Sequence, residues 1–283
     1  MLSSFTGTFK CGRRRRPTSG IPTTGLYSHY DFSLLSDPVS TSYSTNNQSI
    51  PNSSGLLIGS VAGTPALSFL TSGTNTPATI SSTAGGKKFI SLPATSSNSN
   101  GGYLRSAGNA FPNVTTAGYS CIAVWRYSAG GGSAGWTTPP YRYLPGGFGS
   151  EFNGLMYFTN MGGQNELEVI TAAATNVSAA IAAPNRNGSS GIVIDMITVI
   201  SNTVTVRSTI NGTASTIYDF SGTLNSTPTY STTLSSSLRT FDLASTWYSA
   251  RPAINLYEFA FYSSPLTLSE QTSVFSGLYT KWA

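Results

Sequence analysis

Short apolar stretches alternate with turn-rich ones along most of the chain, from Gly25 to about Pro265. This spacing is typical of a sandwich or barrel, in which short strands follow one another through polar turns. The pattern predicts eight strands, over Leu26–Phe32, Tyr119–Tyr127, Leu155–Thr159, Glu166–Thr171, Gly191–Ile200, Thr203–Ile210, Ala214–Phe220 and Ala253–Tyr262.

Two successive hairpins are predicted between residues 191 and 220. The first turns at Ser201-Asn202 and the second at Asn211-Gly212. Asn-Gly is the dipeptide that best supplies the two positive φ angles of a tight hairpin turn. We therefore expect these three strands to form an antiparallel meander.

The last predicted strand is apolar on both of its faces. Alternation along a strand places one set of side chains together, namely Asn255, Tyr257, Phe259 and Phe261. The other face then holds Ile254, Leu256, Glu258, Ala260 and Tyr262. We expect the aromatic set to face the core.

Residues 267–283 are the one segment with a clear helical pattern. Thr267 and Glu270 have the spacing of a capping box. Apolar residues then recur at helical spacing, at Val274, Phe275, Leu278 and Trp282. We expect this stripe to pack on the sandwich, and insertion into a partner's groove is the alternative.

The composition supports an all-β protein with long polar loops. Only 9% of the residues are charged, whereas soluble domains typically carry about 25%. The chain holds 45 Ser and 37 Thr, which favour caps and turns over helix interiors. Because 39% of the residues are nevertheless hydrophobic, the chain has too much apolar surface to be a disordered low-complexity segment.

The net charge of +5 is confined to the N-terminus. Residues 1–20 hold five basic residues and no acid, so the rest of the chain is neutral. We divide the chain into an extended basic arm, residues 1–24, and a domain of residues 25–283. Pro17 and Pro22 oppose regular structure in the arm. The expected anchor residues of the arm are Phe5, Phe9, Lys10, Arg13, Arg14, Arg15 and Arg16.

The arm has three interpretations that stay open. It could bind nucleic acid or phosphate, act as a nuclear-localisation patch, or dock onto an acidic groove of an assembly. The chain has no run of about 18 apolar residues and no apolar secretory core near Met1. We therefore expect neither membrane insertion nor classical export. The contexts of Cys11 and Cys121 differ too much to suggest a disulfide framework.

Four segments in the right order resemble the concanavalin A-like lectin/glucanase superfamily, in its laminin-G-like branch. They are GLYSHYDFS, YSCIAVWRY, TVTVRSTINGT and INLYEFAFYSSPLTLSEQTSVFSGLYTKW. The last is similar to the family's closing strand, turn and short helix ending in K-W. The resemblance covers residues 25–283. It implies an antiparallel two-sheet jelly-roll sandwich, often with a glycan-binding role.

The residues argue against an enzyme. Glucanases of that superfamily carry E-x-D-x-E on one strand, whereas this chain has only Glu166-Leu167-Glu168, for which a solvent-facing edge strand is the better explanation. The G-x-S-x-G match at Gly131–Gly135 lacks a downstream histidine, since the single histidine is His29. We interpret His29 as a packed or surface strand residue. The five aspartates are scattered, so we predict no metal site and no cofactor.

Two clusters of aromatic and basic residues are candidates for glycan or protein contact. The segment Tyr127–Phe152 is a long loop rich in Gly and Pro, and such loops are often functional. Rigid aromatics beside an arginine stack on sugars or anchor protein interfaces, and a minor core is the third possibility. The candidates are Trp136, Tyr141, Arg142 and Tyr143 in this loop and Trp247, Tyr248 and Arg251 before the last strand.

These features together favour a virion structural protein. It would be made in the host cytoplasm, anchored in a shell through the arm, and would display a lectin-like domain for host attachment. Its partners would be other capsid or virion proteins, including further copies of itself, and host glycans or proteins. Nucleic acid would be reached only through the arm. A carbohydrate-binding module outside a virion is the alternative hypothesis, and a degenerate glycoside hydrolase is the third.

Overall fold

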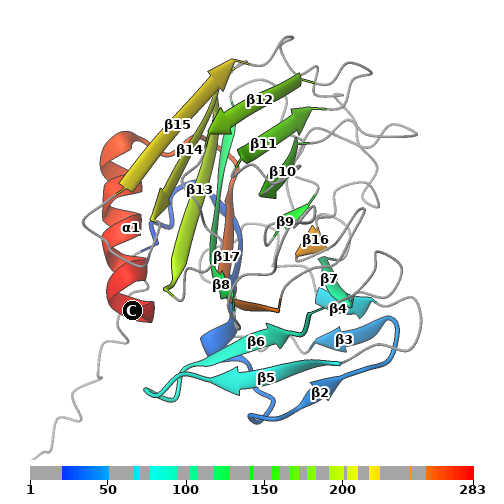
Figure 1. Cartoon of the computed structure of the whole chain (residues 1–283). Coiled ribbons are helices and arrows are strands. Elements are labelled where there is room, and N and C mark those ends of the chain that lie inside the picture. Colours follow the sequence, from blue (N-terminus) through cyan, green and yellow to red (C-terminus); the bar gives the residue numbers. More distant parts are fainter. Residues whose placement is uncertain are drawn as a thin grey trace, which may run out of the picture.

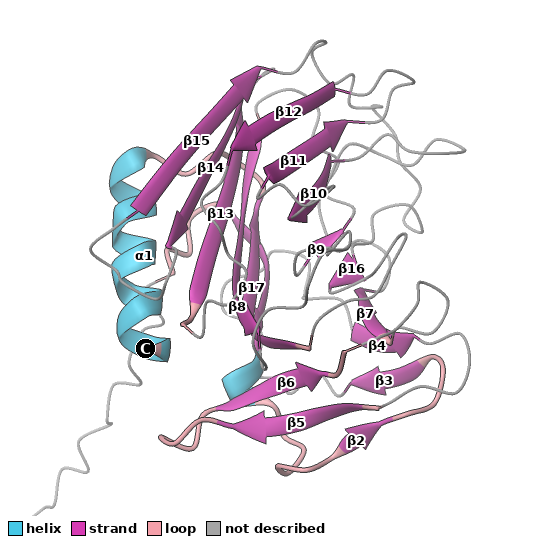
Figure 2. Ribbon diagram, viewed as in Figure 1, coloured by secondary structure: helices cyan, strands magenta, loops and turns pink. Residues whose placement is uncertain are grey.

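A computed structural model describes residues 21–50, 67–70, 77–94, 102–106, 118–127, 141–142, 155–159, 166–171, 177–182, 191–200, 203–209, 217–223, 242–243 and 253–283. The described residues form antiparallel strands and one α-helix, α1 (Leu268–Trp282). Strands dominate the molecule in Figure 2. The prediction of an all-β fold of antiparallel sheets with a short C-terminal helix is confirmed, while the arm's residues 1–20 lie outside the described ranges.

The largest sheet has nine described strands, in the order β15-β14-β13-β8-β17-β6-β5-β2. The ninth strand, β1, also pairs with β17. Their bounds are β1 (Leu26–Asp31), β2 (Ser42–Tyr43), β5 (Ala78–Ser82), β6 (Lys88–Leu92), β8 (Tyr119–Tyr127), β13 (Val193–Ile200), β14 (Thr203–Thr209), β15 (Ile217–Thr223) and β17 (Ile254–Tyr262). A short 3₁₀ helix, Phe32–Leu34, follows β1.

Two smaller sheets face the nine-stranded one. The first has the order β3-β4-β7-β16-β9, with bounds β3 (Gln48–Ile50), β4 (Leu67–Leu70), β7 (Tyr103–Ser106), β16 (Asp242–Leu243) and β9 (Tyr141–Arg142). The second is β10 (Leu155–Thr159), β11 (Glu166–Thr171) and β12 (Val177–Ala182). Strand β10 contacts β9, so the three-stranded sheet adjoins the five-stranded one, and β12 contacts β15 at the edge of the nine-stranded sheet.

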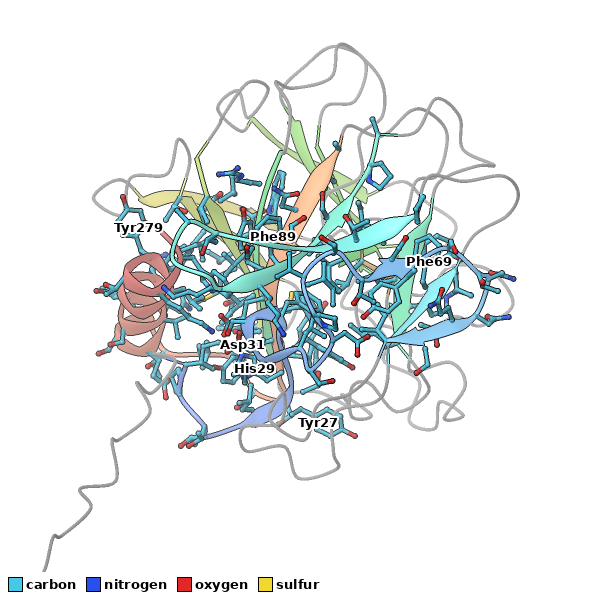
Figure 3. The ribbon with its side chains drawn as sticks, turned by 90° about the horizontal axis from the view of Figure 1, so that it is seen from below. Tyr27, His29, Asp31, Phe69, Phe89 and Tyr279 are labelled. Atoms are coloured by element: carbon cyan, nitrogen blue, oxygen red, sulfur yellow. The ribbon has the colours of Figure 1, made fainter. Side chains whose placement is uncertain are left out.

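Two separate cores lie on the two faces of the nine-stranded sheet. One is the sandwich core, which joins that sheet to the five-stranded sheet through residues such as Phe69, Leu104, Trp125 and Phe259. The other lies under α1, and Figure 1 shows the helix on one side of β13 and β8 and the smaller sheets on the other. Figure 3 shows Tyr279 on the helix and Phe69 at the opposite side of the molecule. The nine-stranded sheet is therefore the middle layer of three, which explains why β17 is buried along its whole length.

A β-bulge in β17 corrects the predicted faces of that strand. Its pairing with β8 shifts between Leu256 and Glu258, so Tyr257 is an extra residue. A bulge breaks the alternation of side chains. Ile254, Leu256, Phe259 and Phe261 consequently share the sandwich core, whereas Tyr257, Ala260 and Tyr262 lie in the core under the helix. The expectation that Asn255, Tyr257, Phe259 and Phe261 form one core-facing set was therefore wrong.

The predicted meander is present, but one of its registers differs. Ile200 pairs with Thr203, as a two-residue turn at Ser201-Asn202 requires. In the second hairpin Thr209 pairs with Ile217, so β15 begins at Ile217 and not at Ala214. Asn211-Gly212, the predicted turn, lies outside the described residues.

The C-terminal helix begins as the sequence predicts. Thr267 Oγ1 accepts from the backbone N–H of Glu270, and Glu270 Oε2 accepts from the backbone N–H of Thr267, which closes the capping box. Val274, Phe275, Leu278 and Trp282 are buried in the core under the helix. The prediction that this stripe packs on the sandwich is confirmed.

The described chain already packs on the sandwich at its first residues. Ile21 is buried in the core under the helix, and the carbonyl of Pro22 accepts a hydrogen bond of 3.0 Å from Tyr262 Oη. Gly25 has φ +72°, and a Cβ there would lie 2.6 Å from Ser264 Oγ. The turn into β1 therefore requires glycine.

Candidate functional site

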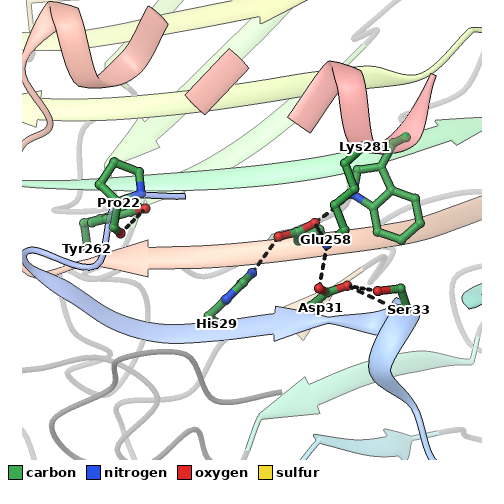
Figure 4. Close-up of polar contacts among 8 residues, drawn as sticks. Pro22, His29, Asp31, Ser33, Glu258, Tyr262 and Lys281 are labelled. Carbon is green, nitrogen blue, oxygen red and sulfur yellow. Dashed lines mark hydrogen bonds and ion pairs between the residues drawn. The ribbon is translucent and has the colours of Figure 1, made fainter. Parts of the chain in front are cut away.

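Ionisable side chains gather where β1, β17 and the last turn of α1 meet. Asp31 of β1 pairs directly with Glu258 of β17, and His29 lies two residues before Asp31 on the same strand face. Lys281 and Trp282 reach the same point from the helix (Figure 4). We call these five residues the terminal clamp, because they join residues up to 250 positions apart in the sequence.

Every carboxylate oxygen of the terminal clamp has a protein donor. Glu258 Oε1 accepts from His29 Nε2 at 2.6 Å, and Glu258 Oε2 accepts from Lys281 Nζ and Trp282 Nε1, both at 2.7 Å. Asp31 Oδ2 accepts from Lys281 Nζ at 2.5 Å. Asp31 Oδ1 accepts from the Ser33 hydroxyl at 2.6 Å and from the Ser33 N–H at 3.1 Å.

The clamp is closed to solvent. The side chains of His29, Glu258 and Asp31 are 0%, 1% and 5% exposed, and that of Lys281 is 16% exposed. Two carboxylates directly opposite on neighbouring strands would repel each other, and the Lys281 ammonium lies between them. Burial raises the pKa of Glu258, but the hydrogen bond and charge of His29 and those of Lys281 lower it by more. The pKa of Glu258 therefore lies below its ordinary value of 4.5.

This geometry suits a structural lock and not a catalyst. A general acid or nucleophile must come within hydrogen-bond distance of a substrate. Every oxygen of both acids already accepts a hydrogen bond from the protein, and the acids themselves are buried. The interpretation of His29 as a packed residue is confirmed, although its pairing with Glu258 was not foreseen.

A second buried carboxylate, Asp195, faces the sandwich core. Its Oδ2 accepts from Trp125 Nε1 at 2.7 Å and its Oδ1 from Ser208 Oγ at 2.5 Å. Buried polar groups whose hydrogen bonds are all made favour one arrangement of the core over others. Asp195 therefore fixes β8, β13 and β14 to one another.

The outer face of the five-stranded sheet has a different character. Leu67, Phe69 and Leu104 point into the sandwich core, so the alternate residues Ser68, Tyr103 and Arg105 are on the outer face and are partly exposed. The Arg105 guanidinium lies 5.4 Å from the centre of the Tyr103 ring, which is a cation–π arrangement.

Cross-strand pairing extends this outer face into a polar row. Ser49 pairs with Ser68, Ser68 with Arg105, Arg105 with Asp242, and Asp242 with Arg142. The row thus crosses all five strands and consists of Ser49, Ser68, Arg105, Asp242 and Arg142. We call it the outer polar row.

The structure places two of the predicted contact residues. Arg142 occupies the last register position of the outer polar row. Its neighbour Tyr141 occupies the register position opposite the buried Leu243. The other candidates, Trp136, Tyr143, Trp247, Tyr248 and Arg251, and the arm residues Phe5, Phe9, Lys10 and Arg13–Arg16, lie outside the described ranges.

The strand that carries Glu166 and Glu168 is not at an edge. Strand β11 is the middle of its three-stranded sheet, so the expectation of an edge strand was wrong. The backbone positions that pair with Glu168 are Phe158 and Ala180, and Glu166 pairs with Ala182. Neither β10 nor β12 contributes an acidic residue at any position.

Within the described ranges, no group of three or more His, Cys, Asp or Glu residues is arranged to hold a metal ion. No helix in the same part of the chain combines the length and hydropathy needed to cross a membrane. Cys121 is a buried free thiol.

Comparison with solved structures shows a β-rich fold. The chain is similar to the binding domain of botulinum neurotoxin DC in complex with rat synaptotagmin II, with a TM-score of 0.52, 11% identity and coverage of 82% of this chain and 51% of that chain. It is also similar to a mutant GH54 α-L-arabinofuranosidase soaked with 4-nitrophenyl α-L-arabinofuranoside, with a TM-score of 0.50, 12% identity and coverage of 83% and 51%. Trypanosoma rangeli sialidase follows with a TM-score of 0.47, 11% identity and coverage of 90% and 33%.

The chain thus spans about a third to a half of the length of these structures. No protein-family model matches it, and no curated protein is similar to it in sequence. At such low identity the likeness concerns the fold alone. The fold is a β-sandwich of the kind found in carbohydrate-active and binding proteins.

Proposed function

We propose that residues 25–283 form a non-catalytic recognition domain of the concanavalin A-like, lectin-like type. The observation that carries the proposal is the terminal clamp, in which all four oxygens of the buried Glu258 and Asp31 accept from protein donors. Asp195, the other fully buried acid of the described residues, is engaged in the same way. Asp31, Asp195 and Glu258 therefore serve packing, while the aromatic and basic residues remain for contact with a ligand.

We further propose that this domain belongs to a virion structural protein. The five cations of residues 1–20 account for the whole net charge of +5, which suits an arm that inserts into an acidic groove of a shell. The neutral, hydroxyl-rich domain would then face outwards, and Trp136 or Trp247 would contact host glycans or proteins. The alternative is a carbohydrate-binding module outside a virion. It would use the same domain, but its arm would not anchor it in a shell.

Two experiments separate these functions. Mass spectrometry of particles purified from cells that produce the chain should detect it in stoichiometric amounts. Deletion of residues 1–20 should abolish incorporation and leave the thermal transition unchanged. Replacing Arg13–Arg16 by glutamine is the matched control for charge. Absence of the full chain from particles rejects the virion role, and incorporation of the deleted chain rejects the anchor.

Recognition and catalysis are tested with the purified chain. A glycan array and a pull-down with host-surface proteins should identify a ligand, and silence in both would reject the recognition role. We expect no turnover of 4-nitrophenyl glycosides. Turnover that is abolished by Glu168→Gln but not by Glu270→Gln would show that the domain is a glycosidase.

A further inference from the structure

We propose that the nine-stranded sheet binds a neutral oligosaccharide on its helix-side face, beyond the C-terminal end of α1, through Arg126 of β8 and Asn255 of β17. This inference rests on the proposed recognition function and names a site and a ligand class for it. The residues of the site form one row across the sheet, which we call the helix-side row: Arg126, Asn255, Ser91, Thr79 and Ser42.

Strand pairing places the whole row on one face of the sheet. Each member pairs with the next one on the neighbouring strand, in the order β8-β17-β6-β5-β2. The strand neighbours of Asn255 and Ser91, among them Ile254 and Leu92, point into the sandwich core. Side chains alternate along a strand, so the row points to the opposite face, on which α1 also packs.

The helix ends just short of the row. Its last residue, Trp282, packs edge-on against Tyr257 with 5.2 Å between the ring centres, and Tyr257 packs on Phe89 at 4.9 Å. Tyr257 and Phe89 each lie two positions from a member of the row on the same strand. In the view of Figure 1, β6, β5 and β2 lie below the C-terminal end of the helix. Four members of the row are partly or fully exposed, and Asn255 is 3% exposed.

Arg126 and Asn255 each leave a buried polar atom without a partner. Among the described residues, Arg126 Nε donates to no acceptor and Asn255 Oδ1 accepts from no donor. Both side chains lie close to the Tyr257 hydroxyl: burial raises the pKa of Tyr257, whereas the charge of Arg126 and a hydrogen bond with Asn255 lower that pKa. Buried polar atoms in proteins are nearly always paired, so an orphan donor and an orphan acceptor at directly opposite positions point to a missing partner.

A sugar hydroxyl is complementary to this pair of atoms. It accepts from the guanidinium of Arg126 and donates to Asn255 Oδ1, whereas a carboxylate or phosphate has no proton to give and would set another acceptor against Oδ1. Because no described partner holds the guanidinium, the long side chain of Arg126 can turn outwards and admit the hydroxyl to Asn255. Donation from a charged group also makes the hydrogen bond to the sugar stronger. The pair therefore favours a neutral, hydroxyl-bearing ligand over an anion.

The rest of the row extends the site across three more strands. Neighbouring strands lie about 4.8 Å apart, so about 19 Å separates the backbones of Arg126 and Ser42, a span that suits several sugar units in line. Serine and threonine hydroxyls both donate and accept, as the binding of sugar hydroxyls requires. The rings of Tyr257 and Phe89 are 1% and 7% exposed, so they close one side of the row and offer no face for stacking. Hydrogen bonds therefore carry the recognition.

The binding test uses the full chain on an array of linear neutral oligosaccharides, namely fragments of β-glucans, mannans and xylans, beside acidic fragments of polygalacturonate and alginate. We expect binding of neutral members. Isothermal titration calorimetry with the neutral oligosaccharide that binds most strongly should give an affinity that added salt changes by less than about twofold, because screening acts on pairs of charges.

Substitutions then locate the site. Arg126→Gln should weaken binding of that oligosaccharide by about 10- to 100-fold, as the loss of a hydrogen bond from a charged group predicts. Arg207→Gln is the matched control, since Arg207 lies on β14 and donates to Gln271 of α1. The thermal transition of each variant reports whether it is folded.

A second variant keeps the arginine and gives it a partner within the protein. In Asn255→Asp the new carboxylate would pair with Arg126 and still accept from the Tyr257 hydroxyl, so the variant should fold while the site is closed. We expect its affinity to fall by at least about tenfold. This variant decides the question if Arg126→Gln fails to fold.

The outcomes distinguish this inference from the proposed function. Unchanged affinity in folded Arg126→Gln or Asn255→Asp overturns the site while the lectin-like function stands, and so does binding lost only on substitution of Trp136 or Trp247. Selective binding of the acidic fragments, weakened by salt, overturns the neutral ligand class. A chain that binds a host protein and no glycan overturns this inference alone, whereas one that binds neither overturns both proposals.

Discussion

Replacement of Glu258 by glutamine tests the terminal clamp most directly. Glutamine has nearly the size of glutamate but replaces one acceptor oxygen by an NH₂ donor. In the clamp, donors face both oxygens of Glu258: His29 on Oε1 and Lys281 with Trp282 on Oε2. With its NH₂ toward Lys281 and Trp282, the glutamine amide meets two donors at a site that is 1% exposed. With its NH₂ toward His29, it requires the imidazole to carry its proton on Nδ1 so that Nε2 accepts, and Lys281 loses the charge of Glu258 in either orientation.

The expected loss follows from the burial of the clamp. Breaking a buried ion pair by removing one partner costs about 3–5 kcal/mol. Because Asp31 still balances Lys281 after the change, we expect the lower end, about 3 kcal/mol of unfolding free energy. In a domain of this size that corresponds to a melting temperature lower by about 6–12 °C.

The assay is urea unfolding followed by circular dichroism, with a thermal melt at a fixed scan rate. Glu270→Gln is the matched control, because Glu270 lies at the helix N-terminus and glutamine also closes a capping box. The control should change the unfolding free energy by about 0.5 kcal/mol or less. A loss below about 1 kcal/mol for Glu258→Gln would refute the assignment of the clamp as a lock.

Four further predictions use other described groups. The pKa of Glu258 lies below its ordinary 4.5 in the folded protein, so the stability that its charge contributes is complete above pH 4.5. This stability is lost as the pH falls through the lower folded pKa, and the difference in unfolding free energy between the wild type and Glu258→Gln should therefore shrink in acid. Burial raises the pKa of Tyr30, and burial together with Asp37 raises that of Tyr43. The free energy of unfolding should therefore fall above pH 10, where the tyrosines of the unfolded chain lose their protons first, and spectroscopic titration of the tyrosines checks this order. Burial raises the pKa of the Cys121 thiol, and in a Cys11→Ser variant Ellman's reagent should react only on unfolding; fast reaction of the native protein would contradict this. Gly102→Ala would place a Cβ 2.2 Å from the buried Phe69 ring, and chemical denaturation should reveal a loss of about 1–3 kcal/mol.

The long strands could be predicted because their information is local. Tyr119–Tyr127, Leu155–Thr159 and Glu166–Thr171 have the bounds that their apolar runs indicate, since each run ends at turn-forming residues. The capping box of Thr267 and Glu270 is local in the same way. Patterns of this kind need no knowledge of the partner strand.

The bulge and the second hairpin register depend on distant partners. Tyr257 is an extra residue only with respect to β8, whose sequence lies more than 100 residues earlier. Strand β15 begins at Ile217, opposite Thr209, whereas the local pattern predicts a start at Ala214. The pairing of a strand depends on its partner, which the local pattern does not include.

The terminal clamp could have been suspected from isolated polar residues in apolar segments. His29 and Asp31 interrupt the first strand on one face, and Glu258 interrupts the last strand. Lys281 follows at the end of an otherwise apolar helical stripe. Buried charges require partners, so such residues in separate segments indicate mutual contact. Which segments meet is set by topology, and the pattern alone does not reveal it.

The position of β17 has a consequence for biosynthesis. This strand lies at the centre of the nine-stranded sheet, between β8 on one side and β1 and β6 on the other, yet it is the last strand in the chain. During translation the edges of β1, β6 and β8 have no central partner until residue 262 has left the ribosome. Unpaired edges associate with other chains. A chain truncated before residue 254 would therefore keep these edges unpaired and should be prone to aggregate.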